Sequence, residues 1–548
     1  MSKRLEQTPL ASDEPLYSYH AFLFPFEWNY RRPTGPLLED QTDLQRLEQL
    51  MSAPGSAWER RGAWTAPSSL LQFNEVAYFY DFVRPVLYDT GKPDSFQRHY
   101  YYRLPGPPDA AEYRIEVPSG REYKLKIDDI VVSYYDTGVG VLAFHLYNKE
   151  VDQSAPEDIL AINAFGRRIY PPYFGSNTGL LGQQAFFDDA DWEKGLQRTL
   201  EAKQMAQSIA ILADGKVLAH EDFSSWLRDQ NLNREPDLVR HLLPAAILLE
   251  LELQPVLDDR MFTVCWYGNK GLAQDLTGQT PDQHYKTHDW WYQYVFVDSD
   301  GATVQNDEMK KKLLEGATNA RWAGYGTFYG LSRYSFMALS GECTAHPFNR
   351  TLASHTMTIY YKIALLGLVQ RACLLRFSQE VTNISQLPKD DKHIAARVGS
   401  LYKQYIRFIN KIYFREVTAQ EQGTELYDIL QEQMWLDDQV KDLDRELQEL
   451  HQYVLILEED RRNSKLDVLT YIGAFFVVPS FIGTYFGIND FPMWEDGNWL
   501  AISAMCLMAA LLVFGAIKSS PRRRLLWMVA TVLFMVYVLV VYPYGKFG

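Results

Sequence analysis

The chain has few cysteines, no leading apolar segment and none of the common nucleotide-binding or nucleophile motifs. Its four cysteines form no C-x-x-C pair, which argues against a disulfide framework and against a cysteine zinc site. The first ten residues contain no apolar h-region, so we predict no cleavable signal peptide. There is no Walker A loop and no G-x-S-x-G elbow, so we predict a protein that is not an enzyme and holds no resident cofactor.

Acidic residues outnumber basic ones, and the 548-residue chain has a formal net charge of -15. This balance argues against direct DNA or RNA binding and is compatible with a protein that handles cations. Aromatic residues make up 14% of the chain and occur in runs such as Trp290-Trp291-Tyr292. These runs predict a large aromatic core; the alternative is a stacking surface for a planar ligand.

The N-terminal part has the mixed pattern of an α+β domain. We predict a disordered polar tail at residues 1–16 and an α+β domain at 17–345, with strands in two sets that suggest a sandwich. The clearest element is a β-hairpin between Tyr123 and Tyr147. Further predicted elements are strands at Tyr17–Phe26, Met261–Tyr267 and Trp291–Val297 and a buried helix at Leu238–Leu251.

A helical region follows, predicted at residues 346–465. Helices are expected at Thr351–Glu380 and Ala395–Thr418, and a third begins near Thr424 and continues without a stop into an apolar segment. Along it, apolar residues alternate spacings of four and three: Leu436, Val440, Leu443, Leu447, Leu450, Val454 and Leu457. This 3.5-residue repeat is typical of a coiled-coil stalk, and a single amphipathic helix on a globular core is the alternative.

Residues 466–548 form the predicted all-α transmembrane region. Two apolar segments at 468–488 and 499–517 are long enough to cross a bilayer, and a third at 525–542 is slightly short. Basic residues precede the first segment and follow the second, whereas the loop between them carries only acidic charge. The positive-inside rule therefore predicts a cytoplasmic N-terminal region and an outward-facing loop.

The first apolar segment ends in Pro-Ser-Phe-Ile-Gly-Thr-Tyr-Phe-Gly-Ile-Asn-Asp, residues 479–490. A Gly-x-Asn motif at the outer end of the first of two closely spaced membrane helices resembles the CorA-type divalent metal-ion transporters. The resemblance implies a homo-oligomeric funnel, a pentamer in that family, in the bacterial inner membrane. It also implies that the first membrane helix lines the pore. The third apolar segment departs from the family's two-helix plan.

The resemblance implies a selectivity filter of Gly487, Ile488 and Asn489, in which a ring of amide oxygens holds a hydrated ion without fixed side-chain ligation. Acidic residues of the loop would concentrate cations at the entrance: Asp490, Glu495 and Asp496. One helix face below the filter is the predicted pore lining: Thr484, Ser480, Val477, Gly473 and Asn463. Mg2+ is the first candidate ion, with Zn2+, Co2+ and Ni2+ open.

Leu466 and Leu469 lie on the same helix face and are the predicted gate, because apolar rings can close a pore by dewetting. In the alternative arrangement, this face contacts the second membrane helix or lipid.

The N-terminal domain is about twice the length usual for CorA proteins, and it is similar to that of the CorA-like effectors of type III CRISPR systems. That resemblance implies gating by a nucleotide second messenger. A glycine- and aromatic-rich stretch offers candidate ligand contacts: Arg321, Trp322, Tyr325, Tyr329 and Arg333. The alternative for this stretch is a glycine-rich hairpin packed in the core.

A second candidate cluster is His284-x-x-x-His288-Asp289, whose spacing suits a metal ion only if the segment is helical. Pro281 and the following aromatic run favour a loop or strand, so we predict no metal there. The leading hypothesis is a divalent cation channel gated by its cytoplasmic domain through the Thr424–Lys465 stalk. The rival is a membrane-anchored oligomeric receptor or scaffold that conducts no ions.

Overall fold

The computed structural model describes residues 15–486 except 34–40, 61–69, 90–91, 93–95, 108–109, 118, 170–207, 223–234, 257–259, 279–283, 299–302, 345–346 and 389–392, and it also describes residues 529, 530 and 533. The chain divides into two compact units, Met1–Leu450 and His451–Gly548. Most of the predicted 1–16 tail, the whole segment predicted at 499–517 and most of the segment predicted at 525–542 lie outside the described residues.

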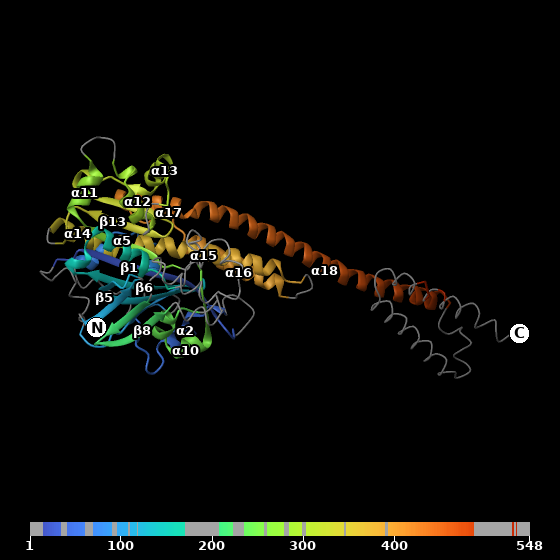
Figure 1. Cartoon of the computed structure of the whole chain (residues 1–548). Helices are drawn as coiled ribbons and strands as arrows, with labels where there is room; N and C mark the ends of the chain where they lie inside the picture. The colour runs from blue at the N-terminus through green and yellow to red at the C-terminus, as the bar shows by residue number, and fades with distance from the viewer. Residues whose placement is uncertain are drawn as a thin grey trace, which may run out of the picture. The chain divides into compact units, whose positions relative to one another are not determined.

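The first unit is built on one large sheet (Figure 1), in which the described residues contribute 13 hydrogen-bonded strands. The strands are β1 (Ser18–Tyr30), β2 (Trp58–Arg60), β3 (Gln97–Tyr102), β4 (Ala111–Glu116), β5 (Glu122–Tyr135), β6 (Val139–Asn148), β7 (Ser208–Ala213), β8 (Lys216–Asp222), β9 (Leu251–Pro255), β10 (Phe262–Gly268), β11 (Thr318–Asn319), β12 (Phe328–Ser332) and β13 (Ser335–Ser340). They join one sheet rather than the two sets of strands that we predicted.

The strand order is β11-β12-β13-β10-β1-β6-β5-β4-β7-β8, with β2 and β3 attached through β5 and with β9 beside β1. All named pairs are antiparallel except β10 with β13. The predicted hairpin is confirmed as β5 and β6, and the predicted first strand is confirmed as β1 but extends four residues further.

Pro25 lies inside the central strand β1, although proline has no N–H to donate to a strand ladder. On one edge of β1, the pairing with β10 covers Ser18 to Leu23 and the pairing with β9 starts at Phe26. Pro25 therefore lies in the gap between two neighbouring strands, where the missing donor costs no ladder bond on that edge.

Helices pack on the sheet, and the described chain after the last strand, β13, is mostly helical. The α-helices are α2 (Leu44–Met51), α3 (Leu70–Ala77), α4 (Arg84–Leu87), α5 (Pro156–Gly166), α9 (Asp237–Leu242), α10 (Ala245–Glu250), α11 (Lys270–Thr277), α12 (Asp289–Phe296), α13 (Asp307–Ala317), α14 (Pro347–His355), α15 (Tyr361–Ser385), α16 (Ile394–Lys411), α17 (Glu421–Met434) and α18 (Leu436–Phe486). Short 3-10 turns are η4 (Val151–Gln153), η7 (His284–Lys286) and η8 (Ala323–Tyr325), and the π-helix η9 (Thr356–Tyr360) joins α14 to α15.

The helical segment Phe348–Ser385 is the one described helix that is long and apolar enough to cross a membrane, and 83% of its apolar window is buried. Its second part, α15, packs on β1 and β6 (Figure 1). From α15, the buried Arg376 donates to the Thr137 carbonyl at 2.5 Å and to Asn29 at 3.0 Å. These contacts with the sheet show that α15 is the central helix of the first unit.

Three predicted elements are wrong. Trp291–Val297 is not a strand but most of α12, which His288 caps and which ends at the left-handed residue Val297. Leu238–Leu251 is not one helix, because Pro244 separates α9 from α10 and Leu251 begins β9. The third long helix is also interrupted, because α17 ends at Met434 and Trp435 has a φ of 55° before α18 begins.

Candidate functional site

Helix α18 carries the predicted pore positions up to Phe486, one residue before the G-x-N motif. The filter residues Gly487, Ile488 and Asn489 lie outside the described residues, as do the entrance residues Asp490, Glu495 and Asp496. Val477, Ser480 and Thr484 lie in the α18 backbone, and their side chains are outside the described set. The roles of these residues therefore stay predictions.

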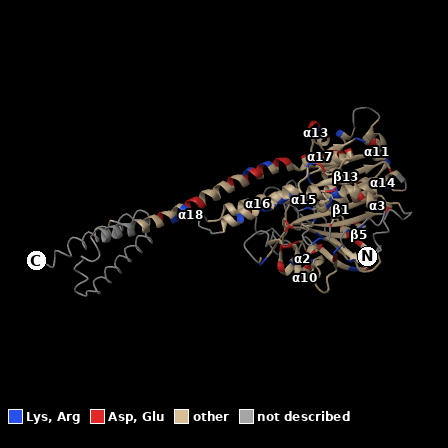
Figure 2. Cartoon of the chain, turned by 180° about the vertical axis from the view of Figure 1, so that it is seen from behind, with Lys and Arg blue, Asp and Glu red and all other residues tan. Residues whose placement is uncertain are grey.

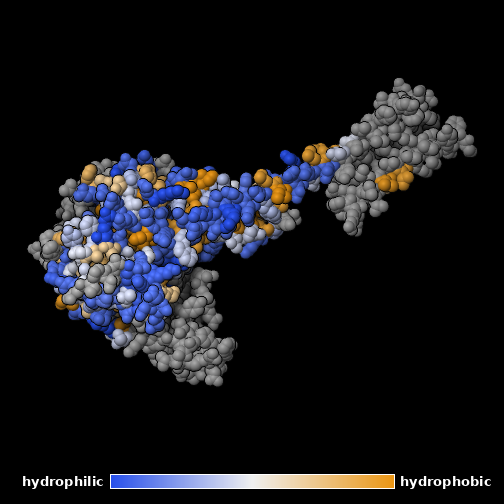
Figure 3. Space-filling model, turned by 90° about the horizontal axis from the view of Figure 1, so that it is seen from above, coloured by the Kyte–Doolittle hydropathy of each residue, from blue (hydrophilic) through white to orange (hydrophobic). Residues whose placement is uncertain are grey.

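The inner predicted pore positions are described, and their side chains are exposed in the single chain. Leu466 is 51% exposed and Leu469 is 62% exposed, and Asn463 and Gly473 are exposed beside them. Gly473 has open space where a Cβ atom would project. Figure 3 shows hydrophobic patches among the hydrophilic surface of the helical part. Exposed leucines at helical spacing are compatible with contact with lipid, another helix or another copy of the chain.

The predicted coiled-coil seam has a different environment. Leu436, Leu443, Leu447 and Leu450 are buried within the single chain. Helix α16 lies against this part of α18, since the Tyr405 hydroxyl donates to the Val440 carbonyl at 3.4 Å. In this part of α18 the amphipathic-helix alternative therefore describes the packing, because the same chain covers the seam.

Charged residues occur along the first part of α18 (Figure 2), and several of them are exposed. Lys441 pairs with Asp438 at 3.2 Å, and Arg445 pairs with Asp442 at 2.5 Å. Both are exposed pairs three residues apart on one helix, so each contributes little to stability. They keep this face of α18 soluble while the seam packs inward.

A groove of about 490 Å³ lies between α16 and the first part of α18. Aromatic residues and two basic side chains contribute to its lining: Tyr402, Tyr405, Tyr413, Arg415 and Lys441. Tyr413, which follows α16, donates a hydrogen bond to Asp437 of α18.

The five predicted ligand residues do not share one surface. Tyr329 is only 1% exposed in β12, and its ring packs edge-on against Tyr360 with centroids 5.3 Å apart, which corrects its assignment as a stacking residue. Trp322 and Tyr325 remain accessible in and beside η8, at 38% and 70% exposure. The segment is the loop and second strand of an antiparallel hairpin, in which β11 pairs with the buried β12 and η8 lies in the glycine-containing loop, so the hairpin alternative is confirmed.

Arg321 joins the sheet domain to α17. Its guanidinium forms ion pairs with Glu421 and Glu425, and Asn319 also donates to Glu425 at 2.9 Å. These carboxylates raise the pKa of Arg321, so the side chain stays charged. The partners lie about a hundred residues away along the chain, and no local pattern indicates this pairing.

Arg333 occupies the β12–β13 turn and contacts the residue between α17 and α18. Its guanidinium carbon lies 4.2 Å from the Trp435 ring centroid, which is a cation–π geometry. Arg371 of α15 donates to the Arg333 carbonyl at 2.7 Å. The predicted ligand residue Arg333 therefore supports the helix junction instead of facing the Trp322 surface.

The buried histidines of the sheet are core groups. Burial lowers the pKa of His20 to about 4 and the pKa of His145 to about 3. His20 contacts Asn163 at 2.7 Å, and His145 contacts the Tyr19 hydroxyl at 2.6 Å. Both imidazoles are therefore neutral and hydrogen-bonded at neutral pH, which suits packing rather than metal binding.

Comparison with known proteins concerns the helical end of the chain. A family model described as CorA-like Mg2+ transporter protein matches residues 379–518. No curated protein and no solved structure gives a significant match. The matched range begins in α15 and ends just after the second predicted apolar segment, so the sheet lies outside it. Residues 379–518 are therefore similar to the CorA-like Mg2+ transporter family, and this similarity suggests divalent cation transport.

Proposed function

We propose that this protein is a homo-oligomeric divalent cation channel whose sheet domain controls its pore. One observation carries the proposal: the CorA-like match at 379–518 includes both apolar segments and the G-x-N motif at 487–489. Mg2+ is the proposed ion, because neutral amide oxygens suit a cation that keeps its water shell. The bilayer and further copies of the chain, five by analogy with the family, are the implied partners.

The exposed leucines of α18 support a pore lined by this helix. A ring of Leu466 and a ring of Leu469 in the oligomer would bury side chains that are half exposed or more in one chain. Such apolar rings exclude water from a narrow pore and hold it closed. Asn463, three residues before Leu466, would form a polar ring on the cytoplasmic side.

The pore is tested by cation flux into proteoliposomes that contain the full chain, with Mg2+ and Zn2+ measured separately. We expect flux that Asn489→Ala abolishes or makes unselective, whereas the matched control Asn498→Ala, in the same predicted loop, retains it. Equal flux for both variants would contradict the filter assignment. Absence of flux under every condition would favour the scaffold that conducts no ions.

The exposed aromatic surface at η8 supports gating by a ligand with a planar base and a phosphate. The Trp322 and Tyr325 rings lie 6.0 Å apart, and Phe348 continues the surface at 6.4 Å from Tyr325. Aromatic faces stack bases at about 1–3 kcal/mol per base. The Arg321 guanidinium lies 6.0 Å from the Trp322 ring, which is within reach of a phosphate on a stacked nucleotide.

A phosphate at this surface would compete with Glu421 and Glu425 for Arg321. Both carboxylates belong to α17, so the competition weakens the link between the sheet domain and the helix that precedes α18. A ligand shifts a closed–open equilibrium only when its affinity differs between the two states. Here the difference arises because Arg321 is released from α17 in one state. A nucleotide second messenger, as in an antiviral CRISPR response, has the required chemistry.

Gating is tested by adding a panel of nucleotide second messengers to the same proteoliposomes. We expect one of them to stimulate flux, and we expect Trp322→Ala to weaken the response while Phe73→Ala, another exposed aromatic position, leaves it unchanged. Stimulation that survives Trp322→Ala and Tyr325→Ala together would place the ligand elsewhere, with the α16–α18 groove as the next candidate.

A further inference from the structure

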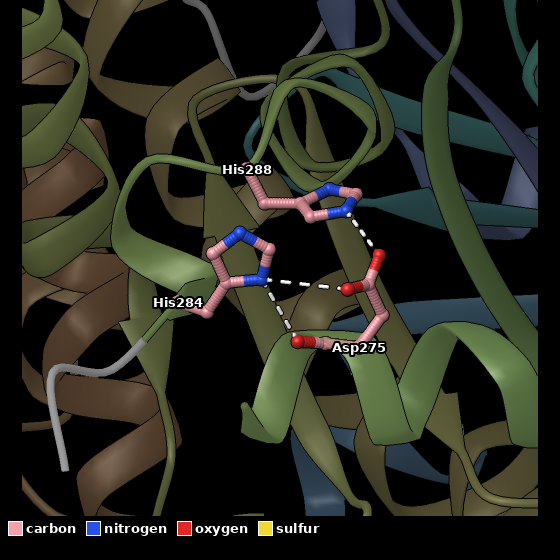
Figure 4. A group of neighbouring side chains, drawn as sticks. All are labelled: Asp275, His284 and His288. Carbon is pink, nitrogen blue, oxygen red and sulfur yellow. Dashed lines mark hydrogen bonds and ion pairs between the residues drawn. The ribbon is translucent and has the colours of Figure 1, made fainter. Parts of the chain in front are cut away.

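Three side chains that the proposed channel mechanism does not use meet at the surface of the sheet domain (Figure 4). Asp275 comes from α11, His284 from η7, and His288 from the N-cap of α12. One potential ligand atom from each lies within 4.8 Å of the other two. The histidine pair was visible in the sequence, but the segment is not a continuous helix, and the carboxylate comes from Asp275 instead of Asp289.

His284 faces Asp275 through its Nδ1 atom. Its Nδ1 lies 2.9 Å from the backbone carbonyl oxygen of Asp275, which can only accept a hydrogen bond. The same Nδ1 lies 3.6 Å from the Asp275 carboxylate, so Nδ1 is the nitrogen of His284 that faces the other two side chains. An ion among the three side chains would replace the Nδ1 proton and this hydrogen bond, and the ring proton would move to Nε2. The His284 side chain is 49% exposed, so an ion can reach it from solvent.

His288 and Asp275 supply the remaining donors. His288 Nε2 lies 3.0 Å from the Asp275 carboxylate, and its Nδ1 accepts a 3.3 Å hydrogen bond from the Trp291 N–H. The two imidazole rings are nearly perpendicular, at 89°, with centroids 5.2 Å apart. An ion at Nε2 would displace the hydrogen shared with Asp275, and the ring proton would move to Nδ1. The long capping bond to Trp291 is the contact given up.

Three described charged side chains near the cluster have partners: Lys286, Asp289 and Lys310. Lys286 pairs with Glu315 at 2.7 Å, and Asp289 pairs with Lys310 at 2.5 Å. Lys310 also pairs with Asp307 at 3.5 Å. These pairs link η7 and α12 to α13, so neither lysine competes with an ion for Asp275.

We infer that Asp275, His284 and His288 form a site for Zn2+ or a similar transition-metal ion. Two imidazoles and one carboxylate are a recognised zinc donor set, and a water molecule would complete a tetrahedron. Mg2+ is a poor occupant because it prefers oxygen ligands in an octahedron. The bound ion would fasten α11 to the start of α12. The site does not depend on the pore. Metal binding here can therefore be tested independently of the proposed channel activity.

The test is Zn2+ binding to the purified full chain after chelator treatment, measured by calorimetry in excess Mg2+. We expect His284→Ala and His288→Asn each to remove one Zn2+ equivalent per chain. Asparagine keeps an acceptor for the Trp291 N–H, so the second variant preserves the cap. His241→Ala is the matched control, because His241 is another exposed histidine whose Nδ1 contacts a backbone carbonyl, at 2.7 Å.

A second readout uses Co2+, whose visible absorption reports tetrahedral nitrogen and oxygen coordination. The wild-type chain and His241→Ala should show the band, and both site variants should lose it. Binding should also weaken as pH falls, because the imidazole nitrogens must be deprotonated to hold the ion. Equal Zn2+ stoichiometry in wild type, both site variants and the control would overturn the assignment.

Discussion

The two parts of helix α18 have similar apolar residues and different surroundings. Leu443, Leu447 and Leu450 are covered by the same chain, whereas Leu455, Leu466 and Leu469 are more than half exposed. The first group therefore contributes to the folding of the first unit, whereas the second is open to contact with another copy, another helix or lipid. A repeat of apolar residues along one helix thus identifies an apolar face. It does not say whether that face packs against the same chain or against something else.

The largest difference in folding stability is expected when one leucine of each group is replaced by alanine. Leu447→Ala removes a side chain that is 1% exposed, and we expect a loss of about 2 to 5 kcal/mol in folding stability, measured by the unfolding transition of the full chain. Leu469→Ala should leave that transition nearly unchanged and should raise basal cation flux, because the apolar ring becomes wider. Equal destabilisation by both substitutions would remove the distinction.

Acid should affect the first unit through its buried histidines. Their pKa values are lowered by burial from an ordinary 6.5 to about 4 for His20 and about 3 for His145. The unfolded chain therefore binds more protons below pH 6.5, so stability is lost as pH falls toward these values. The expected loss is up to about 1.4 kcal/mol per pH unit for each histidine.

The measurement is denaturation followed at several pH values between about 7 and 4.5 by tryptophan fluorescence of the sheet. His145→Gln should reduce the slope, because glutamine does not titrate, whereas substitution of the exposed His241 should not. An unchanged slope in His145→Gln would show that this histidine is not buried as a neutral group.

The sequence predicted elements best where a local pattern allowed one structure. The β5–β6 hairpin combines alternating apolar residues with a glycine turn, and Gly138 adopts the expected positive φ of 78°. The aromatic run at 290–296 fits a helix or a strand equally well, and its cap at His288 decides between them. The break at Pro244 had a visible signal, whereas the break at Trp435 involves neither glycine nor proline.

The candidate functional residues also differ in how well the sequence alone predicts them. The G-x-N motif can be identified from sequence because its residues are consecutive and follow an apolar segment. The contact between Arg321 and α17 cannot, because its carboxylates lie 100 and 104 residues further along the chain. Asp275 was missed for a similar reason, since only the fold brings α11 beside η7.

The junction between α17 and α18 provides a smaller test. Trp435 has a positive φ, which favours glycine, and it also contacts Arg333 through its ring. Trp435→Ala loses the ring contact and keeps the unfavourable backbone conformation, whereas Trp435→Gly loses only the ring contact. We expect the glycine variant to be more stable than the alanine variant by about 1 kcal/mol in thermal unfolding. The reverse order would show that this junction is not left-handed.

The smallest effect on stability and the most specific effect on function are expected at Arg321. Its ion pairs with Glu421 and Glu425 lie at the surface, so Arg321→Ala should leave the unfolding transition almost unchanged. Because these pairs link the sheet domain to α17, the same substitution should raise basal flux and abolish stimulation by the ligand. Arg445→Ala, which removes another exposed ion pair, should do neither. If Arg321→Ala retains normal stimulation, the signal reaches α18 by another route, and the Arg333–Trp435 contact is the next connection to test.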